Sequence, residues 1–545
     1  MTAAGAVGNT LAGLGIRRVF GVVGSGNFHV TNALVAGGAH FVAARHEGGA
    51  ATMADAYSRM SDTVAAVTVH QGCGLTNAMT GITEAEKSRT SLLVLSAEVT
   101  EMRSNFYVDQ HGLADSVGAI TMRVEAAEDA VATAVRAYHL ARDDRRTVVL
   151  NLPLAVQAAQ TAEPTTKVSE LPRPPQTEPD AAGLARLVDA LTHAERPVFV
   201  AGRGSRTSGA REALLELGEV CGALLATSAV AKGLFHGSPW SIDVSGGFAS
   251  PLAAQLIRDA DLIVGWGCAL NMWTTRHGHL IAPQATVAQV DLDPNALGAH
   301  RPIQFGVIGG VTPTAQAATA SITEVRVGYR SERIRKEIQQ RVRWRDVDYH
   351  DTSTADRIDP RTLTIALDDM VPAERVIGVD SGNFMGYPSM FLSVPDEYGF
   401  CFTQAFQSIG LGLATAIGAA LAQPDRLPIA ALGDGGALMS VAELDTVRRL
   451  GLPMIVIVYN DDAYGAEVHH FGPDGADLST VRFPPTDIAA IARGFGFDAV
   501  SVTRPDDLAA VKTWLDGARG RPLLIDAKVT ADRASWWLEE AFRGH

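Results

Sequence analysis

The feature that most constrains the fold of this chain is a glycine-rich turn between two apolar segments, GDGG at 433–436. The apolar run 428–432 before the turn predicts a buried strand. The turn itself is too tight for side chains with a Cβ. We expect Ser440 to cap the helix that follows, which would end near Arg449, with Glu443 completing a capping box.

A second apolar run, 453–459, predicts the next strand, and Asn460-Asp461-Asp462 follows it directly. Parallel strands joined by a helix bring the loops after both strands to one edge of the sheet, where open α/β sheets bind ligands. Asp434 and Asp461 can therefore meet at this edge. Two carboxylates in a glycine-lined crevice need a cation, and hard oxygen ligands suit Mg²⁺. The alternative is that the two segments are an ordinary turn and an ordinary loop.

Short apolar runs alternate with helical stretches along the whole chain, and this rhythm predicts mainly parallel sheets covered on both faces. The fold class is therefore α/β, with three doubly wound parallel-sheet domains at 1–160, 182–330 and 358–545. The segments 155–181 and 329–357 are expected to be linkers, and the first and third domains to share one architecture. The predicted strands are 19–23, 40–44, 64–69, 92–97 and 147–152, then 197–201, 223–228, 261–266 and 286–291, then 375–379, 428–432, 453–459, 498–502 and 522–527.

Net charge and cysteine spacing indicate the expected cellular compartment and the classes of partner that are not expected. The formal net charge of -14 argues against nucleic acid or an anionic membrane as a partner. The four cysteines show no CxxC spacing, which favours reduced thiols. The first fifteen residues lack a signal-peptide pattern, and no apolar run approaches the length of a membrane span. We therefore expect a soluble cytoplasmic protein.

The GDG turn, the spacer and the N-[ND] pair resemble the motif of thiamine-diphosphate (ThDP) enzymes. In that family the aspartate of GDG, the second residue of the pair and a backbone carbonyl two residues further on bind Mg²⁺. Carried over, these are Asp434, Asp461 and the carbonyl of Ala463. Asp461 departs from the commoner asparagine. Its extra charge is expected to bind Mg²⁺ at least as well but to repel the diphosphate more.

The segment RHEGGA at 45–50 ends a predicted strand and opens a predicted helix. Taken alone, Glu47 is best explained as a helix cap. In a domain that precedes a ThDP motif, it resembles the activating glutamate of the pyruvate decarboxylase and acetolactate synthase family. That glutamate binds N1′ of the aminopyrimidine and favours the imino tautomer, which removes the proton from the thiazolium. The resemblance spans pyrimidine-binding, central and diphosphate-binding domains, nearly the whole chain.

The same resemblance implies further cofactor-binding positions. The segment 404–418 resembles the GTMGYGLPAAIG segment, and it places Ile409 under the bent cofactor, although a plain core isoleucine would look identical. The segment 20–27 resembles FGVPGG at the mouth of the site, and 72–77 resembles the GPGATN turn. Residues 380–383, after a strand, are expected against the cofactor. The full cofactor set is Ser381, Gly382, Asn383, Ser408, Ile409, Gly433, Asp434, Gly435, Gly436, Asp461, Ala463 and Tyr464.

Substrate-handling residues follow from the same comparison. Glu467 matches a glutamate that lies over the cofactor in pyruvate decarboxylase, and it could protonate the enamine left by CO₂ loss. His70 lies where benzoylformate decarboxylase has an active-site histidine. Each histidine taken alone is more often a surface or loop residue. The other substrate candidates are Ser25, His29, His111, His469 and His470.

The central domain carries a weaker nucleotide pattern, GRG at 202–204 after one strand and DLDP at 291–294 after another. A lone GxG is weak evidence for a nucleotide. Relatives keep this domain with FAD, with another nucleotide, or empty. We expect an empty central domain, with FAD as the alternative.

The function implied is a ThDP- and Mg²⁺-dependent lyase or carboligase that cleaves or joins C–C bonds next to a carbonyl. It would decarboxylate a 2-oxo acid and protonate the resulting enamine or ligate it to a second carbonyl. The alternative is a non-catalytic ThDP-fold subunit with a regulatory or structural role. One ThDP must touch both Glu47 and Asp434, which lie in separate domains. Relatives meet this need between chains, so a homodimer or a dimer of dimers is expected.

Overall fold

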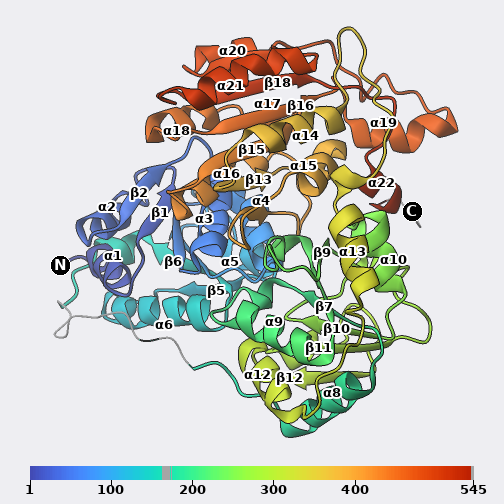
Figure 1. Cartoon of the computed structure of the whole chain (residues 1–545). Helices are drawn as coiled ribbons and strands as arrows, with labels where there is room; N and C mark the ends of the chain where they lie inside the picture. The colour runs from blue at the N-terminus through green and yellow to red at the C-terminus, as the bar shows by residue number, and fades with distance from the viewer. Residues whose placement is uncertain (163–171, 173–174, 542–545) are drawn as a thin grey trace.

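A computed structural model describes residues 1–162, 172 and 175–541. Its three six-stranded sheets have the strand orders β2-β1-β3-β4-β6-β5, β12-β11-β10-β7-β8-β9 and β14-β13-β15-β16-β18-β17. All neighbouring strands are parallel. The expected fold class is confirmed. Figure 1 shows the first domain in blue, the central domain in green to yellow and the third in orange to red.

The first and third sheets have the same strand order when each domain's strands are counted from its own start. The central sheet instead has the order of the dinucleotide-binding fold. Inner strands are mainly apolar because helices cover both faces of each sheet. All residues of β3 and of β16 are buried, for example.

The first domain comprises six strands and seven helices. Its strands are β1 (Arg18–Gly21), β2 (His40–Ala43), β3 (Ala65–Val69), β4 (Leu92–Glu98), β5 (Ile120–Arg123) and β6 (Thr147–Pro153). Its helices are α1 (Ala3–Gly13), α2 (Phe28–Ala36), α3 (Glu47–Ser61), α4 (Cys73–Lys87), α5 (Gln110–Asp115), α6 (Ala130–Asp143) and α7 (Leu154–Ala158).

The central domain follows the same alternation. Its strands are β7 (Pro197–Ala201), β8 (Leu224–Thr227), β9 (Ser241–Val244), β10 (Leu262–Trp266), β11 (Thr286–Asp291) and β12 (Phe305–Ile308). Its helices are α8 (Ala181–His193), α9 (Ala210–Cys221), α10 (Pro251–Arg258), α11 (Met272–Thr275), α12 (Val311–Ser321) and α13 (Glu332–Arg341).

The third domain has the strands β13 (Arg375–Val379), β14 (Phe400–Phe402), β15 (Leu427–Gly433), β16 (Ile455–Asn460), β17 (Asp498–Val502) and β18 (Leu523–Lys528). Its helices are α14 (Pro360–Met370), α15 (Gly386–Phe391), α16 (Gly412–Ala422), α17 (Asp434–Met439), α18 (Glu443–Leu450), α19 (Gly465–Phe471), α20 (Ile488–Gly494), α21 (Ala509–Asp516) and α22 (Trp536–Ala541).

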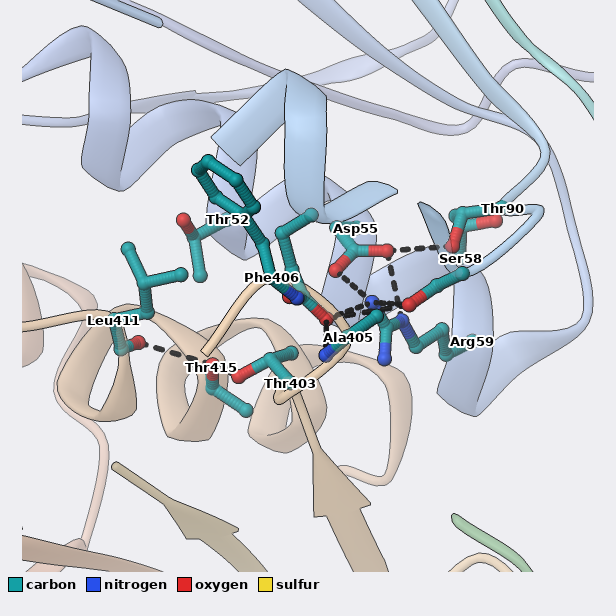
Figure 2. Close-up of polar contacts among 12 residues, drawn as sticks. Thr52, Asp55, Ser58, Arg59, Thr90, Thr403, Ala405, Phe406, Leu411 and Thr415 are labelled. Carbon is teal, nitrogen blue, oxygen red and sulfur yellow. Dashed lines mark hydrogen bonds and ion pairs between the residues drawn. The ribbon is translucent and has the colours of Figure 1, made fainter. Parts of the chain in front are cut away.

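One hydrophobic core joins the first and third domains, and α3 and α16 lie at its centre. The two helices approach so closely that a Cβ added to Gly418 would lie 2.2 Å from the carbonyl oxygen of Met53. Figure 2 shows this crossing, with the loop that carries Ala405 and Phe406 beside Arg59 of α3. The two domains are therefore fixed to one another within a chain.

The expected linkers are only partly irregular. The segment 155–181 includes most of α7, and Gln160 pairs with Thr2, while 163–171 and 173–174 lie outside the described residues. The segment 329–357 contains α13, whose Ile334 and Ile338 pack into the central core. No helix in the described ranges is long and apolar enough to cross a membrane.

The expected capping box at Ser440 is wrong. Asp434 begins α17 directly, and the Ser440 hydroxyl donates to the carbonyl of Gly436 (2.8 Å) at the end of that helix. A separate helix, α18, begins at Glu443. The Glu443 carboxylate does not cap its own helix but reaches into the first domain, because backbone N–H groups there need a buried acceptor.

Candidate active site

Asp434 and Asp461 follow the neighbouring strands β15 and β16, in which Gly433 pairs with Tyr459. Burial raises the pKa of Asp434 to about 6. Burial, followed by the charge of Asp434, raises the pKa of Asp461 to about 7. The structure therefore places two desolvated carboxylates close together at the carboxyl edge of the third sheet.

This pair fits a divalent cation. Within the described residues neither Asp434 nor Asp461 forms an ion pair with a basic side chain. A Cβ on Gly465 would lie 2.4 Å from Oδ2 of Asp461, so glycine leaves the carboxylate room. No group of three or more His, Cys, Asp or Glu side chains able to hold a metal occurs in the described part of the chain. A further protein ligand would have to be another kind of oxygen, and the expected one is the backbone carbonyl of Ala463.

Asp380 connects two loops expected to touch the cofactor. Its buried carboxylate accepts hydrogen bonds from the backbone N–H groups of Ser381 (2.8 Å), Gly410 (3.0 Å) and Leu411 (3.2 Å). Burial raises its pKa to about 7. A Cβ on Gly436 would lie 2.1 Å from Oδ2 of Asp380. Asp380 therefore links the end of β13 to the turn before α16, and its carboxylate lies close beside the first turn of α17.

The remaining cofactor candidates border the same edge. Gly382 has a φ of 138°, which favours glycine. Asn383 Oδ1 accepts from the backbone N–H of Ser535 (3.0 Å), and its carbonyl accepts from Trp537 Nε1 (2.9 Å). Tyr464 is 41% exposed, and its ring lies 4.8 Å from that of Phe483. The other predicted positions in these loops are Ser381, Ser408, Ile409, Gly433 and Gly435.

In the first domain, Glu47 opens α3, and His46 Nδ1 caps the helix by accepting from Gly48 N–H (3.0 Å). Asn77 Nδ2 donates to Glu47 Oε2 (3.1 Å), which orients the carboxylate. Asn77 was not among the predicted site residues, although it ends the segment 72–77 that resembles the GPGATN turn.

His70 lies near Glu47. Its Nδ1 accepts from the backbone N–H of Gly26 (3.3 Å), and its ring packs edge-on against Phe106 at 5.3 Å. Burial lowers the pKa of His70, and the negative charge of Glu47 acts in the opposite direction. Burial thus favours the neutral imidazole of His70, a form that can accept or donate a proton.

The other substrate candidates divide into two groups. Ser25, His29 and His111 are exposed residues of the first domain. Glu467, His469 and His470 lie on α19 of the third domain. Burial lowers the pKa of His469, and its Nε2 is buried without a hydrogen-bond partner. Among the described residues, no hydrogen bond or ion pair connects Glu47 and His70 to Asp434 and Asp461.

Three family models match the chain in the order of its three sheets. The N-terminal TPP binding domain of thiamine pyrophosphate enzymes matches residues 1–121. The central domain matches 184–318, and the C-terminal TPP binding domain matches 380–527. The chain belongs to the thiamine pyrophosphate enzyme family. Thiamine pyrophosphate is another name for ThDP, so the suspected family is confirmed.

Relatives of this thiamine pyrophosphate enzyme carry several different names. The chain is 23% identical to the acetolactate synthase large subunit of Haemophilus influenzae, with 94% of this chain and 92% of that protein covered. It is 27% identical to the sulfoacetaldehyde acetyltransferase of Rhodobacter capsulatus, with 97% and 93% covered. It is 28% identical to the probable 2-ketoarginine decarboxylase of Pseudomonas aeruginosa, with 93% and 90% covered.

The central domain of this thiamine pyrophosphate enzyme borders a cavity of about 1330 Å³, which also touches the other two domains. The glycines of the GRG segment have a packing role. A Cβ on Gly202 would lie 2.3 Å from the carbonyl oxygen of Gly267, and a Cβ on Gly204 would lie 2.8 Å from Cα of Gly267. The GRG segment is thus explained without a nucleotide, and an empty central domain stays a prediction.

Proposed function

We propose that the protein is a ThDP- and Mg²⁺-dependent enzyme that cleaves or joins C–C bonds next to the carbonyl of a 2-oxo acid. The observation that carries this proposal is the pair of half-buried carboxylates, Asp434 and Asp461, within the C-terminal TPP binding domain, whose pKa values are both raised. Two desolvated carboxylates without a basic partner are costly unless a cation joins them. Bound ThDP would supply a carbon nucleophile and an acceptor for the electron pair of the broken bond.

The residues of this chain would hold the cofactor at three places. Asp434, Asp461 and the carbonyl of Ala463 would hold Mg²⁺ and through it the diphosphate. Glu47 would hold a proton at the pyrimidine ring nitrogen, and Asn77 would orient its carboxylate. Ile409 would support the bent cofactor. The remaining loop residues proposed to line the cofactor are Ser381, Gly382, Asn383, Ser408, Gly433, Gly435, Gly436 and Tyr464.

On the substrate side, Glu467 and His70 are proposed to carry acid–base chemistry. Glu467 would donate a proton after CO₂ has left, and neutral His70 would bind or deprotonate the substrate. Ser25, His29, His111, His469 and His470 are proposed to contact the substrate or the acceptor. The presence of Glu467 favours a decarboxylase. The relatives include a synthase and an acetyltransferase, so these two activities are the alternatives within the same class of enzyme.

The alternative function, a ThDP-fold subunit without turnover, is less well supported. A protein that only binds the cofactor has no need for Glu47, yet Asn77 holds this carboxylate at the start of α3. We also propose that the enzyme works as a homodimer or a dimer of dimers. All four cysteines are free, which fits a reducing compartment such as the cytoplasm.

Product analysis tests the proposed function. The protein would be incubated with ThDP, Mg²⁺ and a panel of 2-oxo acids, with and without aldehydes, and the products identified by mass. We expect CO₂ and an aldehyde, or a longer hydroxyketone, from at least one oxo acid. No product should form without ThDP or with Glu47→Gln. Turnover that does not depend on ThDP would contradict the proposal, and bound ThDP without any turnover would favour the non-catalytic alternative.

A further inference from the structure

Two buried glutamates reach across between the first and third domains. Glu443 of α18 is 3% exposed, and Glu84 of α4 is fully buried. Neither carboxylate caps its own helix. Each accepts hydrogen bonds from two consecutive backbone N–H groups of the other domain.

Glu443 binds the two residues that precede Glu47. Its Oε1 accepts from the backbone N–H groups of Arg45 (3.0 Å) and His46 (3.1 Å). Its Oε2 accepts from the hydroxyl of Thr446 (2.6 Å), which fixes the carboxylate itself. A Cβ on Gly49 would lie 2.5 Å from Glu443 Oε1, so glycine at this position is needed for the approach.

Glu84 makes the matching contacts in the opposite direction. Its Oε1 accepts from the backbone N–H of Ala405 (3.1 Å), and its Oε2 accepts from that of Phe406 (2.6 Å). Arg59 Nη2 donates to Glu84 Oε1 (2.8 Å), and the same guanidinium also pairs with Asp55. Ala405 and Phe406 lie beside Arg59 in Figure 2 and precede Ile409 in the chain.

The first and third sheets have the same strand order, which explains why Glu84 and Glu443 make equivalent contacts in opposite directions. Glu84 lies on the helix after the third strand of its domain, and Glu443 lies on the second of two helices after the third strand of its own. The loop that Glu443 binds follows β2, the second strand of the first domain, and leads into α3, whose first residue is Glu47. The loop that Glu84 binds follows β14, the second strand of the third domain, and leads into α16; this loop contains Ile409.

We propose that Glu443 is a positioning residue, which sets the place of Glu47 by holding the N–H groups of Arg45 and His46. Glu84 is its counterpart for the loop that leads to Ile409. The assignment of Glu443 rests on the proposed function of Glu47. Backbone N–H groups in a buried contact need an acceptor, and without the carboxylate the segment 45–46 has to move to find one. Such a movement displaces the adjacent Glu47.

The test compares Glu443→Ala and Glu443→Gln with two controls in the ThDP- and Mg²⁺-loaded protein. Asp445→Ala removes a neighbouring carboxylate that binds the side chains of Arg45 and Arg449 instead of the backbone of the segment 45–46. Leu444→Ala weakens the core on the same helix. Amide hydrogen exchange is followed at Arg45 and His46. The circular-dichroism band of the bound imino tautomer is recorded at saturating ThDP, with Glu47→Gln as the reference for its loss.

Glu443→Ala should speed amide exchange at Arg45 and His46 by roughly tenfold or more and weaken the tautomer band at full cofactor occupancy. Glu443→Gln keeps one carbonyl oxygen that can accept from both N–H groups. Its amide exchange and its tautomer band should therefore be close to those of the wild type. Asp445→Ala should resemble the wild type. Leu444→Ala should lower the thermal midpoint without weakening the band. If Glu443→Ala does not fold, Thr446→Val provides a milder test and should shift both signals in the same direction.

The outcomes separate this proposal from the proposed function. Unchanged amide exchange in Glu443→Ala would overturn the positioning role, whatever happens to activity. Faster exchange with an undiminished tautomer band would overturn it too, because Glu47 would then work without Glu443. A band that survives Glu47→Gln would instead overturn the function of Glu47, while the exchange data would still decide whether Glu443 holds the loop.

Discussion

Burial governs the behaviour of individual residues at this site. Asp434 and Asp461 lie half-buried at strand ends, and partial desolvation makes the ionised form of each carboxylate costly until a cation arrives. The same carboxylates would be unremarkable on an exposed loop. The proposed Mg²⁺ binding therefore depends on the surroundings of the two carboxylates as well as on their identity.

Substitutions at the two aspartates should have unequal effects. Asp434→Ala removes a charged ligand and should abolish Mg²⁺-dependent retention of ThDP, whereas Asp461→Asn keeps an oxygen ligand and should be mild. Equilibrium dialysis of ThDP with and without Mg²⁺ measures both variants. Equal damage from the two substitutions would show that the proposed ligand set is wrong.

The pKa shifts predict how Mg²⁺ affinity varies with pH. The folded-state pKa values of Asp434 (about 6) and Asp461 (about 7) exceed those of unfolded aspartates, so the metal-free protein retains protons there. Its free energy of unfolding should fall as pH rises toward 7, because the unfolded state binds fewer protons. Mg²⁺ displaces these protons, so calorimetry should show its affinity rising up to about pH 7 and then levelling off. A constant affinity from about pH 5.5 to 8 would contradict these shifts.

Local sequence patterns placed Asp434 and Asp461 after neighbouring strands, as the structure does, but misjudged Glu443. The pattern SVAE at 440–443 fits a capping box, yet the carboxylate binds Arg45 and His46 in another domain. No local pattern could have shown this, because the binding partners are about four hundred positions away in the sequence. Asn77 was likewise overlooked, since only the folded chain brings it to Glu47.

At the scale of elements, the predicted strands correspond to the inner strands of each sheet and to the edge strands β2 and β17. The four strands that the sequence did not reveal, β5, β9, β12 and β14, all lie at sheet edges. Each is only three or four residues long and at least partly exposed. Such strands lack the continuous apolar run that marks a strand buried on both faces.

The crossing of α3 and α16 should be the element contact most sensitive to added volume. Gly418→Ala places a methyl group 2.2 Å from the Met53 carbonyl oxygen, and the backbone cannot give way cheaply. We expect a loss of about 1–3 kcal/mol in the free energy of unfolding. Gly494→Ala is the matched control, because its Cβ meets nothing within 4 Å, and it should be neutral or stabilising by up to about 1 kcal/mol. Urea unfolding measures the free energy of unfolding of both variants. If Gly418→Ala were as stable as Gly494→Ala, the close approach of α3 and α16 would be contradicted.

At the scale of the whole molecule, the cofactor must join two domains that belong to different chains in our proposal. Mixing Glu47→Gln with Asp434→Ala tests this arrangement. If subunits exchange and sites form between chains, a mixed dimer has one site with both defects and one intact site. Activity should then return to a fraction of the wild-type value. If both residues of a site came from one chain, no mixture would regain activity.

The most direct test of the account is the exchange rate of the thiazolium C2 proton of bound ThDP, because it needs no substrate. The wild-type protein with Mg²⁺ should exchange this proton faster than free ThDP by about 10²-fold or more. Glu467→Gln, which removes a carboxylate elsewhere in the proposed site, should behave like the wild type. Glu47→Gln should still bind ThDP yet exchange at close to the free rate. Exchange in Glu47→Gln as fast as in the wild type would contradict the account.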